Sequence, residues 1–467
     1  MKKIIVMIIN IGLFISVLIS CSSSIPSKTL DCFNSNQYDI YVDDNADPEW
    51  YDSTHVRTIQ EGIQNASSGQ SIFVYIGLYI ENIHVNKMVD LTGESSENTI
   101  INGNFVDNVV YVTSDNVSIS HFTIKYSAHI WGQVHAGIYV RSNNTKIFKN
   151  IITENWHGIY LDEISHNNLI FENNISYNSD YGSGLFACGS DNNLITNNTL
   201  LHNIYGITIE SYVVNNIITK NLIRGNLFGI RISFHADNNT IKENNLINNN
   251  WGLDISFYSN NNNITNNKLI RNTDGIFLHD YSGENIIFKN NITKGYYGIH
   301  LLTNYFSVPN QIIKNIITDN YCGIEIRFSH NTFVFNNKII NNYHGIYNYG
   351  SWFTIVLKNR FISDTKALIL MYANNNTVYE NMIFDSEDVG IFLNNSFENS
   401  IYHNALIENG ENAFDEGENF WYSLFLNEGN YWNDFKQNPG FPNYYEIPGG
   451  DNIDYYPLES IWIDTIG

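Results

Sequence analysis

A phrase of about 23 residues, repeated twelve times, constrains this chain more than any other feature of its sequence. Each copy between residues 150 and 413 runs Asn-x-Ile, about five further residues, and Gly-Ile-x-Leu, with apolar variants at the Ile and Leu positions. The small residue of the phrase recurs at Gly158, Gly184, Gly206, Gly229, Gly252, Gly275, Gly298, Gly323, Gly345, Ala367, Gly390 and Ala413. From Gly137, which marks one earlier coil, to Ala413 the chain advances 276 residues in 12 intervals, a mean of 23. A period of this length with short apolar alternation predicts a solenoid, in which each repeat is one coil stacked on the next.

Aligned copies of the phrase give columns of identical or similar residues. The leading residue is Asn in all twelve copies, and a large apolar residue follows two positions later: Asn150, Asn173, Asn198, Asn221, Asn244, Asn267, Asn290, Asn315, Asn337, Asn359, Asn381 and Asn404. A second polar column lies five residues after the first, at Asn155, Asn178, Asn203, Asn226, Asn249, Asn272, Asn320, Asn342, Asp364 and Asn409, and is broken by Gly295 and Ser386.

These columns predict short parallel strands joined by turns. Coils stacked at about 4.8 Å place each Asn above another, so the amides form hydrogen-bonded ladders and the apolar columns form a continuous core. We expect the Gly column where the backbone bends sharply or adopts positive φ. A two-helix repeat does not fit β-branched alternation with Asn-Asn turns, and the Leu spacing of leucine-rich repeats is absent.

The two ends of the repeat region depart from the repeat. Ile59 and Ile63 recur at helical spacing after Thr58, which predicts a short amphipathic helix over residues 57–67 that covers the open edge of the first coil. From Glu416 the chain is aromatic and turn-rich, which predicts a cap on the last coil. The expected parts are an N-terminal cap with the first coils (39–104), the β-helix repeats (105–415) and a C-terminal cap (416–467).

The N-terminus has the features of a targeting segment. Two lysines precede an apolar run over residues 4–19, as in a secretory signal peptide over residues 1–20. The ending Leu-Ile-Ser-Cys resembles the bacterial lipobox, in which cleavage before Cys21 leaves a lipid-bearing cysteine; a plain signal anchor is the alternative. Residues 21–38 then form a tether, and we expect a lipoprotein anchored to the membrane on its extracytoplasmic side, in the periplasm or at the cell surface. No second apolar run approaches the ~20 residues of a membrane span.

The chain is acidic, with 24 Lys and Arg against 47 Asp and Glu, a formal net charge of −23. This balance excludes nucleic acid as a partner, because nucleic-acid binding needs a cationic surface. It also argues against adhesion to anionic membranes, while it permits cation binding. Of the four cysteines, Cys188 and Cys322 lie six coils apart, about 29 Å at 4.8 Å per coil, so we expect no structural disulfide.

Several motifs at the ends of the chain resemble a known family. They are Ile-Tyr-Val-Asp-Asp at 40–44, Thr-Ile-Gln-Glu-Gly-Ile at 58–63, Gly-Asn-Tyr-Trp at 429–432 and Ile-Pro-Gly-Gly-Asp-Asn-Ile-Asp at 447–454. Together with the repeat, they resemble the NosD-like branch of secreted parallel β-helix proteins over about residues 39–460. The resemblance implies an all-β, right-handed parallel β-helix with a pectin lyase-like fold. It also implies a link to copper maturation of nitrous oxide reductase or to surface carbohydrate.

A metal site is one interpretation of the histidines near the first coils. His129 and His135 lie in an insertion before Gly137, and His157 belongs to the next coil. Three imidazoles within two coils could bind copper or another divalent metal such as zinc. Surface histidines in a polar loop are the alternative, and the three methionines beyond residue 21 make a Met-rich copper shuttle unlikely on composition.

A charged patch on one sheet is the second candidate site. Residues two positions after each Gly should point outward, and this column changes from aromatic to charged residues between the coils of Gly229 and Gly323. The predicted ligand or substrate face consists of Arg231, Asp254, His279, His300, Glu325 and Arg327. Charges flanked by aromatic rings suit a polysaccharide groove, while a solvated sheet face is the alternative. Asn-Thr-Asp-Gly at 272–275 looks like a polygalacturonase signature, but no second carboxylate lies at the required spacing, and Asn272 belongs to the Asn column.

Three functions remain open from the sequence. The first is a lipid-anchored extracytoplasmic β-helix that binds a glycan or a cell-surface or periplasmic protein without catalysis. The second is a carbohydrate-active enzyme, a polysaccharide hydrolase, lyase or epimerase, acting along the face between residues 229 and 328. The third is a NosD-like accessory factor for copper-site maturation. The sequence assigns no catalytic residue and no certain cofactor.

Overall fold

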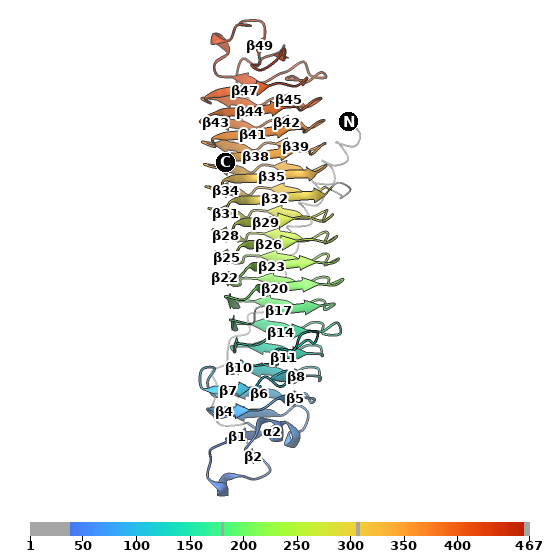
Figure 1. The fold of residues 1–467 in the computed structure, drawn as a ribbon, viewed down its shortest axis with the longest axis vertical. Helices are drawn as coiled ribbons and strands as arrows, with labels where there is room; N and C mark the ends of the chain where they lie inside the picture. The colour runs from blue at the N-terminus through green and yellow to red at the C-terminus, as the bar shows by residue number, and fades with distance from the viewer. Residues whose placement is uncertain (1–37, 179–181, 305–308, 462–467) are drawn as a thin grey trace. The chain divides into compact units, whose positions relative to one another are not determined.

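The computed structural model describes residues 38–178, 182–304 and 309–461. They form a parallel β-solenoid of about 15 turns with about 23 residues per turn, as the repeat predicts (Figure 1). Each complete coil contributes one strand to each of three parallel sheets, which we call A, B and C in chain order, and the two ends of the solenoid add further strands to sheets A and B. The expected signal peptide and nearly all of the expected tether, including Cys21, lie outside the described residues.

Sheet A has 17 strands. They are β1 Ile40–Val42, β2 His55–Val56, β3 Ser71–Val74, β6 Asp90–Gly93, β9 Ser118–Ser120, β12 Lys146–Phe148, β15 Leu169–Phe171, β18 Leu194–Thr196, β21 Ile217–Thr219, β24 Thr240–Lys242, β27 Asn263–Thr265, β30 Ile286–Phe288, β33 Gln311–Ile313, β36 Phe333–Phe335, β39 Ile355–Leu357, β42 Thr377–Tyr379 and β45 Ser400–Tyr402.

Sheet B has 16 strands. They are β4 Gly77–Ile80, β7 Thr99–Asn102, β10 Thr123–Lys125, β13 Ile151–Thr153, β16 Asn174–Ser176, β19 Thr199–Leu201, β22 Leu222–Arg224, β25 Asn245–Ile247, β28 Lys268–Ile270, β31 Asn291–Thr293, β34 Ile316–Thr318, β37 Lys338–Ile340, β40 Arg360–Ile362, β43 Met382–Phe384, β46 Ala405–Ile407 and β48 Tyr431–Trp432.

Sheet C has 15 strands. They are β5 Ile83–Val85, β8 Val110–Val112, β11 Ala136–Val140, β14 His157–Leu161, β17 Ser183–Cys188, β20 Tyr205–Glu210, β23 Phe228–Ser233, β26 Trp251–Ile255, β29 Asp274–Leu278, β32 Tyr297–Asn304, β35 Cys322–Ser329, β38 His344–Tyr349, β41 Lys366–Met371, β44 Val389–Asn394 and β47 Glu411–Asp415.

The Asn columns form the predicted ladders. Asn221 donates its backbone N–H and its side-chain amide to Oδ1 of Asn244, both at 3.0 Å. Its own Oδ1 accepts the same two bonds from Asn198. Each ladder Asn except the half-buried Asn409 is buried, and each follows a residue with positive φ, such as Lys149 at 55°, so these corners are closed in the same way. The ladders therefore satisfy the polar groups that tight corners would otherwise leave buried and unpaired.

A third ladder lies five residues before the first, at the corner between sheets C and A. It runs through Asn168, Asn193, Asn216, Asn239, Asn262, Asn285 and Asn310. All three corners of these coils are thus held by buried amides, and not only the two that the aligned phrase predicts.

The Gly column has a different cause from the predicted one. Gly158 and Gly275 lie inside strands of sheet C, and neither is among the glycines with positive φ. A Cβ atom at Gly275 would lie 2.4 Å from the carbonyl oxygen of Gly298 in the next coil. Glycine is required here because two backbones approach closely, so the expectation of a bend or a positive φ was wrong.

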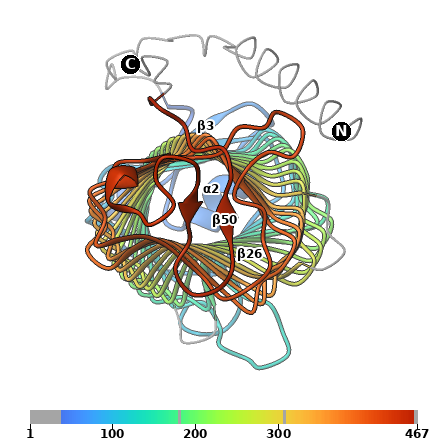
Figure 2. The same ribbon diagram turned by 90° about the horizontal axis from the view of Figure 1, so that it is seen from above.

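The helix at the N-terminal end is α2 (Ile59–Asn65), within the predicted range. The hydroxyl of Thr58 accepts the backbone N–H of Glu61 at 3.2 Å and caps the helix, and Ile59 and Ile63 are fully buried. The helix packs on β1, β2, β3 and β5. Figure 2, a view along the coils, shows α2 beneath the interior of the solenoid at its N-terminal end. A short 3-10 helix, Pro48–Trp50, precedes it.

Aromatic residues close the C-terminal end. The ring of Trp432 stacks on Tyr445 with centroids 3.9 Å apart, and the indole N–H groups of Trp421 and Trp432 donate to Asp415 and Asp454 at 2.8 and 2.9 Å. A 3-10 helix, Phe435–Gln437, and a hairpin of β49 (Tyr445–Glu446) and β50 (Ile453–Asp454) complete this end. The strand β48 continues sheet B, so the aromatic segment contributes one further rung as well as a cap.

The cysteines and the helices of the described residues complete the description of the fold. Cys188 and Cys322 are free cysteines. The described part of the chain contains no helix that is long and apolar enough to cross a membrane.

Candidate functional site

The outer face of sheet C carries the residues that the sequence singles out. The registers pair Arg231 with Asp254, Asp254 with Phe277, Phe277 with His300, and His300 with Glu325 on successive strands. The residues two positions after each Gly, which the sequence aligns in one column, therefore lie next to one another in a row along the solenoid. Asp254 and Glu325 are each only 2% exposed, however, because neighbouring side chains on the same face cover them.

Three of the predicted residues form one ion-paired cluster. The Asp254 carboxylate lies 2.9 Å from Nε2 of His279 and 3.6 Å from Nε of Arg231. Nδ1 of His279 lies 2.8 Å from Asp280. Burial alone would lower the pKa of His279, but the bonds and charges of the two carboxylates raise it above its ordinary value. The two carboxylates thus favour the protonated form of this imidazole, which makes it less suited to act as a base.

His300 belongs to a neighbouring cluster of rings. Its Nδ1 lies 3.4 Å from Asp274, and its ring centroid lies 4.6 Å from those of Phe277 and Tyr297. Phe277 stacks in turn on His279, at 4.2 Å. The two clusters therefore form one packed surface across four coils, with few charges left unpaired.

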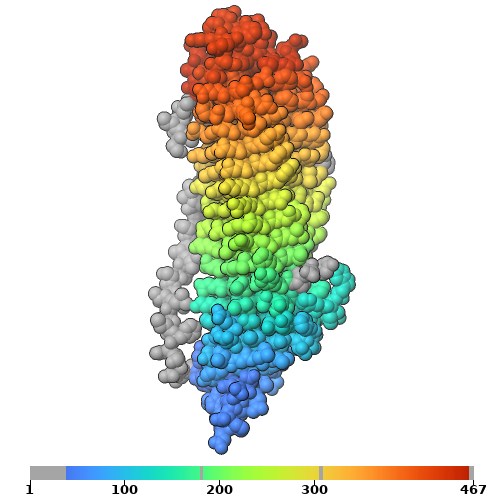
Figure 3. All heavy atoms as spheres, turned by 60° about the vertical axis from the view of Figure 1, so that its left-hand side comes forward, coloured from blue at the N-terminus to red at the C-terminus, as the bar shows by residue number. Residues whose placement is uncertain are grey.

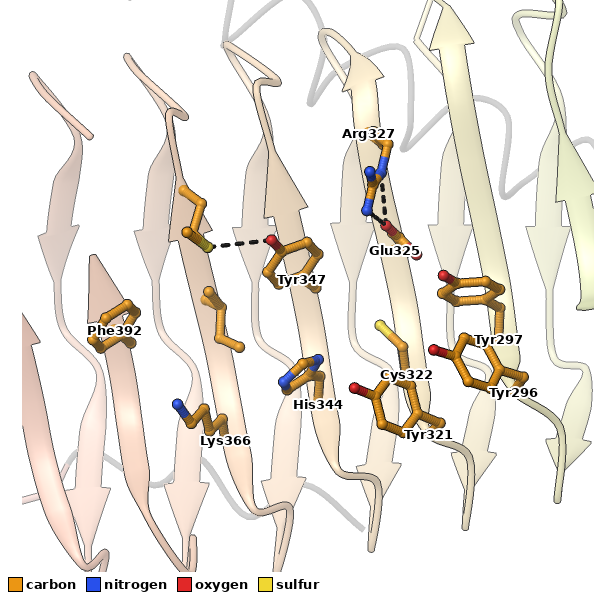
Figure 4. A pocket seen from close by; sticks show the side chains of 12 residues that line it. Tyr296, Tyr297, Tyr321, Cys322, Glu325, Arg327, His344, Tyr347, Lys366 and Phe392 are labelled. Carbon is orange, nitrogen blue, oxygen red and sulfur yellow. Dashed lines mark hydrogen bonds and ion pairs between the residues drawn. The ribbon is translucent and has the colours of Figure 1, made fainter. Parts of the chain in front are cut away.

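Glu325 and Arg327 belong to a groove farther along the same face (Figure 4). The guanidinium of Arg327 donates to Oε1 of Glu325 through Nε at 2.8 Å and through a terminal nitrogen at 2.5 Å. The groove has a volume of about 360 Å³. Its lining residues are Tyr296, Tyr297, Tyr321, Cys322, Glu325, Arg327, His344, Tyr347, Lys366, Ile369, Met371 and Phe392. Arg231, Asp254, His279 and His300 do not line it.

The groove also contains residues that sequence reasoning missed. Tyr297, Cys322, His344 and Lys366 occupy one row, at the position just before each Gly or Ala of the repeat. Successive side chains of a strand alternate between its two faces. Counted back from the outward residue two positions after the Gly, this alternation would place the row on the inner face. The registers pair the residues on either side of the glycine but not the glycine itself, so the alternation of side chains breaks at the glycine. For example, Asp274 pairs with Tyr297 and Ile276 with Ile299.

The groove places a neutral base near a cation, Lys366. Burial, and secondarily the charge of Lys366, lower the pKa of His344, so its imidazole is neutral at physiological pH. Lys366 pairs with Asp388 at 3.3 Å. Burial and the neighbouring Glu325 raise the pKa of Tyr297, so its hydroxyl stays protonated and can donate or accept hydrogen bonds. The groove therefore offers hydroxyls, ring edges and the N–H donors of two ion-paired cations in one place.

Stacking of the tyrosines limits what they can bind. Tyr296, Tyr321 and Tyr343 stack on one another along the solenoid, with centroids 4.5 and 5.1 Å apart. Their faces are covered by each other, so the middle ring presents its edge and its hydroxyl to a ligand. The rings in this row act mainly through hydrogen bonds and edge contacts rather than through open faces.

The three histidines of the predicted metal site have separate partners. Nδ1 of His135 lies 3.3 Å from Asp107, and Nδ1 of His157 accepts the backbone N–H of Ser183 at 3.1 Å. Burial lowers the pKa of His157 to about 3. The ring of His129 packs edge-on against Trp156, with centroids 5.7 Å apart. Among residues 38–178, 182–304 and 309–461, no group of three or more His, Cys, Asp or Glu side chains is placed to hold a metal ion.

A family profile described as "Periplasmic copper-binding protein (NosD)" matches residues 63–256 and 252–437. These matches cover most of the chain, which belongs to the NosD family. The copper in that description finds no fitting donor set in the described residues, since the candidate imidazoles are engaged with separate neighbours. No step of a mechanism is therefore derived through copper.

Solved structures with the same kind of fold are only distantly similar. The chain is 13% identical to an alginate lyase from Paenibacillus sp. str. FPU-7, covering 56% of this chain and 92% of that one, with a TM-score of 0.37. It is 12% identical to the mannuronan C-5 epimerase AlgE4 A-module of Azotobacter vinelandii, covering 76% and 90%, with a TM-score of 0.30. It is also 12% identical to a tailspike double mutant of E. coli bacteriophage HK620 in complex with a pentasaccharide, covering 82% and 80%, with a TM-score of 0.46. No curated protein matches the sequence.

Proposed function

We propose that this chain is a lipid-anchored, extracytoplasmic β-helix that binds a glycan in the groove of sheet C. The observation that supports this function best is the groove itself, which combines four tyrosines with Arg327 and Lys366 on the outer face of a rigid sheet. Sugars present hydroxyls and apolar ring edges together, and a site of hydroxyls, ring edges and cations complements both. The clusters around Asp254 and His300 extend the same face as a polar border.

Binding to a panel of bacterial and plant polysaccharides, followed by calorimetry on any hit, tests this function. The double variant Tyr296→Ala/Tyr321→Ala should bind at least tenfold more weakly than wild type, because it removes two hydroxyls and one wall of the groove. The matched control is Tyr379→Ala/Tyr402→Ala, which removes another stacked pair, 5.3 Å apart, from sheet A. Absence of any glycan binding by wild type, or an equal loss in the control, would reject the proposal.

A carbohydrate-active enzyme is a second candidate, and the neutral imidazole of His344 favours it. A neutral base beside Lys366 could abstract a proton while Lys366 holds a carboxylate of the substrate. His344→Ala should then abolish turnover of a polysaccharide while binding persists. Polysaccharides that bind wild type but are neither cleaved nor epimerised would exclude this role.

An accessory role in copper-site maturation is a third candidate, favoured by family membership. Copper titration of wild type against His129→Ala, His135→Ala and His157→Ala variants tests the histidine site. A loss of one bound copper in these variants would support it, and unchanged stoichiometry would reject it.

The proposed lipid anchor has its own test. The Cys21→Ser variant should appear in the soluble fraction of cells, whereas wild type stays with the membranes. Membrane retention of the Cys21→Ser variant would instead favour an uncleaved signal anchor.

A further inference from the structure

Apolar side chains project from two neighbouring loops near the N-terminal end of the solenoid. One loop, between β7 and β8, carries Phe105 and Val106; the other, between β10 and β11, carries Ile130, Trp131 and Val134. Trp131 is 79% exposed and Val106 is 61% exposed. Figure 2 shows a blue-green loop that extends beyond the outline of the coils, and Figure 3 shows the same colour as a protrusion on one side. We call these five residues the apolar lobe.

The two loops that carry the apolar lobe contact each other at their bases. The backbone N–H of Phe105 donates to the carbonyl of Tyr126 at 2.8 Å, and the two rings lie 4.8 Å apart. Asp107 from the first loop lies 3.3 Å from Nδ1 of His135 in the second. The two loops therefore present their apolar side chains side by side.

Neither the corner nor the core requires this lobe. In the next coil the same corner, between β13 and β14, takes only residues 154–156, whereas between β10 and β11 it takes residues 126–135. The solenoid closes without the additional residues, and their apolar side chains point away from its core. An exposed apolar cluster of this kind in a secreted protein calls for a partner.

The charge of the lobe indicates the kind of partner. Residues 126–135 contain no Asp or Glu, although the chain as a whole has 47 acidic residues. Two acids lie beside them: Asp107 is paired with His135, and Glu154 of the next coil contacts the hydroxyl of Tyr126. Trp prefers the interface between a bilayer and water, where its apolar ring and its polar N–H are both accommodated, and Phe adds apolar contact on the same face.

The place of the lobe in the fold adds a second argument. Its loops leave the solenoid within three rungs of β1, about 14 Å at 4.8 Å per rung. The proposed anchor Cys21 is 17 residues before Tyr38, a length that spans at most about 60 Å and about 23 Å on average if flexible. A lipid at Cys21 would thus keep this end of the solenoid within reach of the membrane.

We propose that the apolar lobe inserts its Trp131, Ile130 and Val134 side chains into the interface of an uncharged or zwitterionic lipid bilayer. This contact is separate from the glycan groove and independent of the lipid at Cys21. It orients the N-terminal coils against the membrane, since a single lipid at Cys21 would limit their distance from the membrane but not their orientation. The net charge of −23 opposes anionic lipid, so the attraction is apolar and not electrostatic.

The experiment uses the full chain with Cys21→Ser, which removes acylation, and vesicles of phosphatidylcholine or phosphatidylethanolamine. Co-sedimentation should detect binding, and Ile130→Ser/Trp131→Ser should lower the partition coefficient at least tenfold. The matched control is Leu424→Ser/Phe425→Ser, which removes two exposed apolar residues from the C-terminal end. Added phosphatidylglycerol should weaken binding.

A second measurement does not depend on how the double variant folds. Brominated lipid should quench part of the tryptophan emission of the Cys21→Ser chain, and Trp131→Phe should remove most of that quenching while vesicle binding persists. The proposal is overturned if the unacylated chain does not bind vesicles, if the control loses as much binding as the lobe variant, or if anionic lipid strengthens binding. Failure of glycan binding leaves each of these outcomes unaffected.

Discussion

Asn342 donates its backbone N–H and its side-chain amide to the same oxygen of Asp364, at 2.7 and 2.8 Å. Asp364 occupies a position of the second ladder where most coils carry Asn, and it is fully buried. Its other oxygen, Oδ2, has no hydrogen-bond partner among the described residues. Burial raises the pKa of Asp364 to about 7, so one rung of the ladder titrates near neutral pH.

Replacing Asp364 by Asn should make the solenoid more stable at high pH. The folded pKa of about 7 lies above the ordinary value of 3.8. Between these values the folded chain binds a proton that the unfolded chain has lost, so wild-type stability falls as pH rises from about 4 to about 7. The loss amounts to about 4 kcal/mol above pH 7. Thermal unfolding should show a larger gain for Asp364→Asn at pH 8 than at pH 5.

The control for this prediction is Asp385→Asn, which neutralises an exposed carboxylate one coil farther along. It should change the melting temperature little at either pH. An equal gain for Asp364→Asn at both pH values would contradict the assignment of the titration to this rung.

Replacing Asn221 by Leu should destabilise the middle of the solenoid by about 2–4 kcal/mol. The substitution removes the acceptor of two bonds from Asn198 and the donors to Asn244 and to the carbonyl of Ile195. Asn245→Leu, an exposed position beside the ladder, serves as the control. Thermal unfolding with limited proteolysis would measure both, and equal stability of the two variants would refute the ladder as a source of stability.

Replacing Gly275 by Ala should cost about 2–3 kcal/mol, because the new methyl group would overlap backbone that cannot move independently. The group would lie 2.4 Å from the carbonyl oxygen of Gly298 and 2.7 Å from Ile292. Gly132→Ala, which meets no atom within 4 Å, should cost only the strain of its positive φ. Melting temperatures in the reverse order would show that close approach is not the constraint on this column.

Replacing Asp254 by Asn should lower the pKa of His279. The raised pKa depends on Asp254 at 2.9 Å and on Asp280 at 2.8 Å, which outweigh burial. In wild type the contribution of this charged pair to stability is complete below about pH 6.5 and is lost as pH rises through the folded pKa. NMR titration of the imidazole C–H signals would measure the shift, and an unchanged pKa would mean that Asp254 does not hold the proton on His279.

The fold follows from the sequence because its evidence is periodic. Identical residues at one offset in every coil must stack, so the ladders of Asn150 and Asn155 and the register of the core could be predicted from spacing alone. The third ladder, through Asn193 and Asn216, has a constant offset of five residues before the first, so the same alignment could have found it. The reason for glycine at position 275 could not be predicted from the repeat spacing, because it depends on how closely the backbone of Gly275 approaches the backbone of the next coil.

The candidate site was only partly predictable, for two physical reasons. The row of Arg231 and Glu325 was found because period-2 alternation holds within a strand. The row of Tyr297 and His344 was missed because the alternation breaks at the glycine between the two rows. The sequence also does not show which charged side chains form ion pairs. In the structure most charges of the predicted patch are paired, as Arg327 is with Glu325, so the patch is largely neutral.

The ladder bonds all point the same way, from Asn150 to Asn173 and onward until Asn404 donates to Asn430. At that end Asn430 turns its amide to the carbonyls of Ile401 and Trp421, which ends the series. Deletion of part of a coil would leave ladder donors without acceptors at three corners. Deletion of a whole coil of 22 to 26 residues would let the Asn residues of the two neighbouring coils bond to each other directly. The reach of such a protein can therefore lengthen or shorten in evolution only in steps of one coil.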